Sequence, residues 1–241
     1  MTLNARKCVH IKFTKNKKIF PTIYFIGSEQ LQEVTSVRDL GVIVDSKLNF
    51  VEHIDGTVSK AWKMVGFIKR MCRDFTSIPA LLTLFNALVR SVLEYATTVW
   101  SPHFQTHIAR LERVQKGFTR YLAYKDPCCP HRVDYMARLS YFKLNTLEDR
   151  RILHDLSFLH KLINGSIDAP NLLASLCLAV PRRIPRFPLE YTFRKAPLRT
   201  KISTPLNRAI EACNNINDID IFRSSTVTFK SLYLKSLLHR Y

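Results

Sequence analysis

The sequence predicts an α+β protein with a small antiparallel β region at its N-terminus, a mostly α-helical body and a basic tail. Before about residue 45, apolar residues alternate with polar ones, which is typical of half-buried strands. After that point they recur every three or four positions, as on amphipathic helices. Five prolines among residues 181–205 then predict an extended arm. We therefore divide the chain into residues 1–50, 51–176 and 177–241.

The β region is predicted to begin with a hairpin. Residues 8–13 alternate in polarity, and residues 19–26 are rich in β-branched and aromatic side chains. Gly27 and Ser28 fit a two-residue turn, because glycine adopts a positive φ without steric cost. Residues 31–34 can then return antiparallel to the preceding strand.

A further strand is predicted over residues 37–44, where Leu40, Val42 and Val44 alternate with other side chains. Gly41 lies in its middle, which indicates that another backbone or a ligand approaches closely there.

The helical body is predicted from runs of apolar residues at helical spacing. Ser77 and Pro79 fit the start of the second helix, and Thr146 fits the cap of the fourth. The predicted helices cover about residues 54–72, 77–100, 103–124 and 146–163, with two short helices at 206–216 and 225–239.

Several classes of protein are excluded by composition. No stretch approaches 18 apolar residues, so we expect no membrane span. No apolar run follows the N-terminus, so we expect a nuclear or cytoplasmic protein that is not secreted. The six cysteines are irregularly spaced, which favours reduced thiols over a set of disulfides. Cys128, Cys129 and His131 do not fit a zinc site, because adjacent cysteines cannot both ligate one ion well and no second pair lies nearby.

The charge balance points to a polyanionic partner, nucleic acid before anionic membrane. Lys and Arg number 37 against 19 Asp and Glu, a formal net charge of +18. We expect cations on one helix face and in the basic arm to bind phosphates; these candidates are Lys60, Lys63, Arg70, Arg182, Arg183, Arg186, Arg194 and Lys195.

Other polar and aromatic residues fit ordinary structural roles. A second basic helix face, formed by Arg110, Arg113, Lys116 and Arg120, is expected to be solvated, with Glu112 paired to Lys116. Trp62 and Tyr95 are expected in the core, the tyrosine with a satisfied hydroxyl, while Trp100 is ambiguous. Asp149 and Asp155 are expected to be solvated, beside Arg150 and Arg151.

Several separated motifs, in the same order, resemble reverse transcriptases of jockey-type non-LTR retrotransposons. They are VRDLGVIVDSKLNF at 37–50, EHI at 52–54, GFIKR at 66–70, LVRSVLEY at 88–95, VWSP at 99–102, IARLERVQK at 108–116 and DIF at 220–222. The resemblance implies that Leu40 and Gly41 form the hairpin that contacts the primer end, that residues 51–176 form a thumb, and that residues 177–241 are the tail of a larger polyprotein.

Catalysis in that family uses Mg²⁺ ions held by aspartates of a palm domain. The family's Tyr-x-Asp-Asp motif does not occur here, and the acids at Asp39 and Asp45 lie on the strand that follows it in the family. The resemblance therefore implies a truncated chain with no catalytic residues and no cofactor of its own. It would bind an RNA template, a DNA primer or their hybrid, together with missing palm and fingers parts.

Two alternatives remain open from the sequence. The chain could be a non-catalytic nucleic-acid-binding or interaction protein derived from a retroelement, or the product of a pseudogene without a role.

The absence of the palm motif generates a first prediction. The purified chain is expected not to extend a primer annealed to an RNA template with Mg²⁺ or Mn²⁺, because the sequence lacks the palm aspartates that hold the two ions. Incorporation of labelled deoxynucleotides measures this, and extension above the level of a no-protein control would contradict it.

Overall fold

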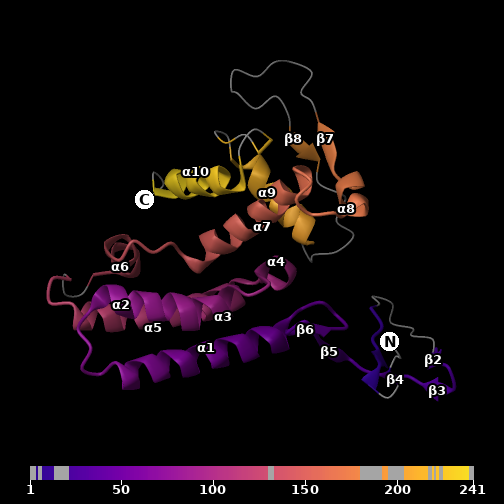
Figure 1. The fold of residues 1–241 in the computed structure, drawn as a ribbon, viewed down its shortest axis with the longest axis horizontal. Coiled ribbons are helices and arrows are strands. Elements are labelled where there is room, and N and C mark those ends of the chain that lie inside the picture. The colour runs from indigo at the N-terminus through magenta and orange to yellow at the C-terminus, as the bar shows by residue number, and fades with distance from the viewer. Residues whose placement is uncertain are drawn as a thin grey trace.

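The computed structural model describes residues 4, 7–13, 22–129, 133–179, 192–194, 204–216, 219, 221–222 and 225–238. It has the predicted α+β class, with short strands at one end of a mainly helical body (Figure 1). Helix α1 (Val51–Met71) runs along one side, and α5 (Gln105–Lys125) lies in the layer beside it. The C-terminal elements lie on the far side of that layer.

The first strands are only two residues long. β2 (Phe25–Ile26) and β3 (Glu29–Gln30) pair antiparallel around Gly27 and Ser28, so the predicted hairpin turn is confirmed. The antiparallel return predicted over residues 31–34 is wrong, because β3 is the returning strand. β4 (Gln32–Glu33) pairs instead in parallel with β1 (Val9–His10).

The predicted single strand over residues 37–44 is wrong. The structure has instead the hairpin that the resemblance implied, with β5 (Ser36–Asp39) antiparallel to β6 (Val42–Asp45). Leu40 and Gly41 form its turn, with φ angles of 44° and 86°. Positive φ at both central residues matches the right-handed twist of the flanking strands, which explains how so tight a turn can connect them.

Side-chain groups fix both ends of α1. The Asp45 carboxylate accepts hydrogen bonds from the backbone N–H groups of Lys47, Asn49 and Phe50, which shapes the loop that leads into the helix. At the other end, the Lys125 ammonium donates to the Cys72 and Phe75 carbonyls at 3.4 and 3.2 Å. The Cys72 carbonyl lies just after the last turn of α1, where a cation is favourable.

The helix predicted over residues 77–100 is interrupted twice. α2 (Ile78–Leu84) passes into a π-helical turn, η2 (Phe85–Arg90), and then into α3 (Ser91–Glu94). The chain then breaks at Ala96, whose φ is 52°, before α4 (Thr97–Trp100). The Trp100 indole N–H donates to the Tyr95 carbonyl at 2.7 Å, which supplies a partner that a continuous helix would have provided.

The first hydrophobic core lies between α1, α5 and the segment α2–α4. Phe85 stacks on Phe118 with ring centroids 4.4 Å apart. The ambiguous Trp100 is buried here. Other side chains of this core are Val42, Ile54, Ala61, Val65, Ile68, Leu81, Val89, Leu93, Leu111, Val114 and Leu122.

Helix α6 (Tyr135–Tyr141), which the periodicity did not predict, packs against α5 and precedes α7 (Leu147–Ile163). The Thr146 hydroxyl accepts the Asp149 N–H at 3.0 Å, so the predicted cap is confirmed.

The predicted pairing of Glu112 with Lys116 is wrong. Glu112 is buried and accepts from the Tyr135 hydroxyl and, at 3.1 Å, from the Leu147 N–H. Burial raises the pKa of Glu112.

A second core lies where α7 meets the C-terminal elements. These are α8 (Pro170–Ala174), the antiparallel pair β7 (Cys177–Ala179) and β8 (Thr192–Arg194), α9 (Pro205–Asn214) and α10 (Thr226–Leu238). Its buried side chains include Leu153, Leu156, Leu159, Phe193, Ile210, Phe229 and Tyr233. Side chains from both sides of residue 177 therefore share one core, while the predicted domain boundaries themselves stay a prediction.

The prediction of a solvated Asp155 is also wrong. Its carboxylate is buried and accepts from the Arg208 guanidinium at 3.1 Å, which joins α7 to α9. Burial raises the pKa of Asp155 to about 6, against the opposing effect of the Arg208 charge.

Nowhere in the described ranges is a helix long and apolar enough to span a membrane.

Trp62, predicted to be in the core, is 37% exposed and lies over α5 instead. A Cβ added at Gly117 would lie 2.5 Å from Trp62 Cη2 and 3.0 Å from Cζ3. The absence of a side chain at Gly117 is what lets the indole reach α5.

This contact generates a second prediction. Alanine usually stabilises a helix relative to glycine, by roughly 1 kcal/mol. We expect Gly117→Ala instead to lower the free energy of unfolding by up to about 2 kcal/mol, because overpacking costs about 1–3 kcal/mol and outweighs that gain. Urea denaturation measures the difference. Gly56→Ala on α1 is the control, since a Cβ there meets nothing within 4 Å. Equal stabilisation by both changes would contradict the prediction.

Candidate nucleic-acid interface

A groove of about 590 Å³ lies where the β5–β6 hairpin meets α1 and α3. Its three walls contribute Arg38, Gly41 and Ile43 from the hairpin, His53, Gly56, Thr57 and Lys60 from α1, and Ser91 and Val92 from α3 with Tyr95 just after it. Gly56 contributes no side chain to the groove, and a Cβ there would meet nothing within 4 Å.

The charged side chains that line the groove are basic. Arg38 comes from the hairpin and Lys60 from α1, and none of the lining residues is Asp or Glu. Both cations lie on exposed residues, so their ammonium and guanidinium groups are accessible to a ligand. The Tyr95 ring and the Val92 side chain add apolar surface. This combination suits a phosphate with an attached sugar or base better than a neutral or cationic ligand.

Two hydrogen bonds dock the hairpin on the helices. The Tyr95 hydroxyl donates to the Leu40 carbonyl at 2.7 Å, and the Ile43 N–H donates to His53 Nδ1 at 3.3 Å. One bond leads to α3 and the other to α1, so the turn is held over the groove from both sides.

His53 is buried at the base of the hairpin, edge-on to Trp100 with ring centroids 4.9 Å apart. Burial, aided by the charge of Arg38, lowers the pKa of His53. Because Nδ1 accepts the Ile43 amide, the proton of the neutral ring is on Nε2, which lies 3.5 Å from the Thr57 hydroxyl. His53 therefore acts as a neutral hydrogen-bond acceptor in the structure.

Two acidic residues near the hairpin, Asp45 and Asp55, are engaged elsewhere. Asp45 accepts the loop N–H groups before α1, and Asp55 pairs with Arg110 at 2.6 Å. Within the part of the chain that the structure describes, no three His, Cys, Asp or Glu side chains are grouped so that they could hold a metal ion. The Mg²⁺ implied by the sequence resemblance belongs to the parent polymerase and stays a prediction.

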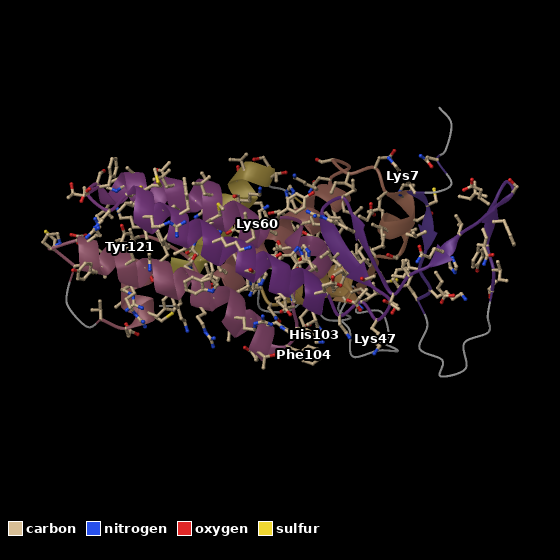
Figure 2. All side chains as sticks on the ribbon, turned by 90° about the horizontal axis from the view of Figure 1, so that it is seen from below. Lys7, Lys47, Lys60, His103, Phe104 and Tyr121 are labelled. Carbon is tan, nitrogen blue, oxygen red and sulfur yellow. The ribbon has the colours of Figure 1, made fainter. Side chains whose placement is uncertain are left out.

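The structure brings together some of the residues predicted to form the site. Gly41 and Lys60 line the groove, and Leu40 lies at its rim, 84% exposed. Lys63 and Arg70 are exposed farther along α1. Figure 2 shows Lys60 near the middle of α1, with Lys7 and Lys47 toward the strand end of the molecule and Tyr121 toward the other.

The candidate residues of the basic arm lie wholly or partly outside the described part of the structure. Arg194 lies in β8, and its side chain is outside the described part of the structure, as are all of Arg182, Arg183, Arg186 and Lys195. Their predicted role in binding stays a prediction.

Arg38, His53 and Tyr95 were missed as site residues. The expected hydroxyl partner of Tyr95 is present, but its place in the core is wrong, since the residue is 55% exposed. The signal that could have found Arg38 is the hairpin that the resemblance implied at Leu40 and Gly41, because a turn there places Arg38 opposite Ile43. His53 and Tyr95 required the contacts between this hairpin and the helices to be known.

A third prediction follows from the neutral His53. Its folded pKa lies below the unfolded value of about 6.5, so the unfolded chain binds the proton first and stability falls as the pH drops below that value. Urea denaturation at pH 7 and pH 5 should show a smaller loss for His53→Asn than for the wild type. The difference is limited to about 1.4 kcal/mol per pH unit for one proton.

Asparagine keeps an acceptor for the Ile43 N–H but cannot take up a proton, which makes it the matched variant. His103 and His154 also have lowered pKa values, and they contribute equally to both proteins. Identical losses in the two proteins would show that His53 titrates normally.

Comparison with known proteins gives a partial relationship. No family model and no solved structure matches the chain. An uncharacterized protein of Caenorhabditis elegans is 29% identical over 138 residues, which cover 57% of this chain and 68% of that protein. A probable RNA-directed DNA polymerase from the Drosophila melanogaster transposon X-element is 21% identical over 122 residues. That match covers 50% of this chain but only 13% of the polymerase. The chain is thus related, over half of its length, to a retroelement polymerase.

Proposed function

We propose that this chain is the template–primer binding part of a jockey-type non-LTR retrotransposon reverse transcriptase, with residues 51–176 as its thumb. The observation that supports this most directly is the groove beneath the Leu40–Gly41 turn, with cations on two walls and no acidic side chain among its lining residues. A phosphodiester backbone is the ligand that such a groove attracts, whatever the base sequence.

The basic face of α1 extends this surface away from the hairpin. Lys60, Lys63 and Arg70 follow helical spacing and are all exposed. At 1.5 Å per residue, the ten residues from Lys60 to Arg70 span about 15 Å, which is about the rise of four base pairs. A helix of this kind can therefore follow several successive phosphates of one duplex.

Phe67 lies between Lys63 and Arg70 on the same side of α1 and is 44% exposed. An aromatic face between cations can contact sugars or an unstacked base without reading its identity. This composition supports binding that depends on the backbone rather than on sequence, as a polymerase requires for its moving substrate.

The match covers only 13% of the Drosophila protein, so we also propose, rather than infer from that match, the activity of the whole polymerase. In this proposal, Mg²⁺-dependent nucleotide transfer takes place in palm and fingers parts that associate with this chain. The bound species is an RNA template, a DNA primer or their hybrid, in the nucleus or the cytoplasm.

A fourth prediction tests the α1 surface. The triple change Lys60→Ala, Lys63→Ala and Arg70→Ala should weaken binding of a fluorescent RNA–DNA hybrid, measured by anisotropy between 50 and 200 mM salt. If each side chain neutralises one phosphate, the slope of log affinity against log salt should become shallower by about 2.1 to 2.7.

A matched control removes three exposed lysines elsewhere, by Lys143→Ala, Lys161→Ala and Lys235→Ala. These residues lie after α6, on α7 and on α10, and they do not line the groove. The control should change the slope little. Equal effects of the two triple variants would mean that net charge, rather than this surface, determines binding.

A further inference from the structure

Tyr95 is directed outward by the break between α3 and α4. Its φ and ψ of −59° and 125° leave the helical region, and Ala96 follows in the left-handed region. The Trp100 indole holds the Tyr95 carbonyl at 2.7 Å on the inner side, and the Thr97 hydroxyl lies 2.9 Å from His154 Nδ1. Both of these contacts are on the buried side, so the break is fixed by the core and the tyrosine ring is presented to the groove.

The outward ring contacts the hairpin turn at two points. The Tyr95 hydroxyl donates to the Leu40 carbonyl at 2.7 Å, and a Cβ placed on Gly41 would lie 3.4 Å from Tyr95 Cε1. The ring thus lies against the turn itself, 55 residues away in the sequence.

The turn needs such a support. Leu40 adopts a left-handed conformation that is unfavourable for a residue with a Cβ, yet its side chain is 84% exposed and gains little from packing. The hydrogen bond from the Tyr95 hydroxyl to the Leu40 carbonyl supplies a contact that stabilises this conformation.

Arg38 lies two residues before the turn and pairs with Ile43 across the hairpin. Its guanidinium therefore moves with the hairpin, whereas Lys60 is fixed on α1. The distance between the two cations across the groove depends on how the hairpin is held.

We propose that Tyr95 is a positioning residue, whose hydroxyl holds the Leu40–Gly41 turn so that Arg38 contacts a backbone phosphate of the nucleic acid opposite Lys60. This inference rests on the proposed function. It assigns to Arg38 the phosphate contact and to Tyr95 the placement of that contact.

Tyr95→Phe removes the hydroxyl and keeps the ring. We expect the affinity for the RNA–DNA hybrid to fall about two- to tenfold, the range for one lost hydrogen bond. The salt slope should become shallower by about 0.7 to 0.9, equal to the change in Arg38→Ala, because one phosphate contact is lost in each variant. In the double variant Arg38→Ala/Tyr95→Phe, the second change should have no further effect.

Tyr124→Phe is the matched control. Tyr124 is 87% exposed on α5 and does not line the groove, so its hydroxyl should be dispensable for both affinity and slope. Thermal unfolding of each variant accompanies the binding measurement. A purely structural role of Tyr95 would lower the melting temperature, leave the slope unchanged and add to the effect of Arg38→Ala, and that pattern would overturn the inference.

The outcomes also separate this inference from the proposed function. A wild-type chain that does not bind the hybrid with a salt-dependent affinity rejects both. A wild type that binds, with Arg38→Ala weakened and Tyr95→Phe unchanged, rejects the role of Tyr95 alone. Loss in both single variants with no further loss in the double variant supports it.

Discussion

The hydrogen bond from the Ile43 amide to the neutral His53 ring is the contact on which the groove depends. The same imidazole lies edge-on to Trp100, and the Trp100 indole in turn holds the carbonyl at the break after α3. One buried histidine therefore connects the hairpin, α1 and the α3–α4 break. Because a protonated ring would lose its acceptor, this arrangement requires that the imidazole stay uncharged.

The far half of the molecule is joined by buried carboxylates instead. Glu112 on α5 accepts from Tyr135 and the first amide of α7, and Asp155 on α7 accepts from Arg208 on α9. Between them, Glu94 accepts two hydrogen bonds from Arg150 and so ties α3 to α7. Buried charges are stable only when such partners are in place, so these contacts specify how the helices dock more than they add to stability.

The sequence predicted features that depend on near neighbours. The long helices α1 and α5 followed from the spacing of apolar residues, and the cap at Thr146 followed from the residue type. It did not predict the break at Ala96, because apolar residues keep helical spacing through it and neither Gly nor Pro marks it. The positions of Asp155 and Tyr95 were also wrong, since their partners lie 53 and 55 residues away. Of the groove residues, charge indicated Lys60 and the glycine indicated Gly41, whereas Arg38 and His53 required the packing of the hairpin against α1 to be known.

The π-helical turn η2 determines which way the side chains of α3 face. A π turn holds an additional residue relative to an α-helical turn. Removing one residue from 85–90 would let the segment relax to a regular helix and would rotate the following residues by about 100°. Val92 and Tyr95 would then no longer line the groove, while the buried side chains before the turn would keep their places. The additional residue in η2 therefore decides whether Val92 and Tyr95 can form the third wall of the groove.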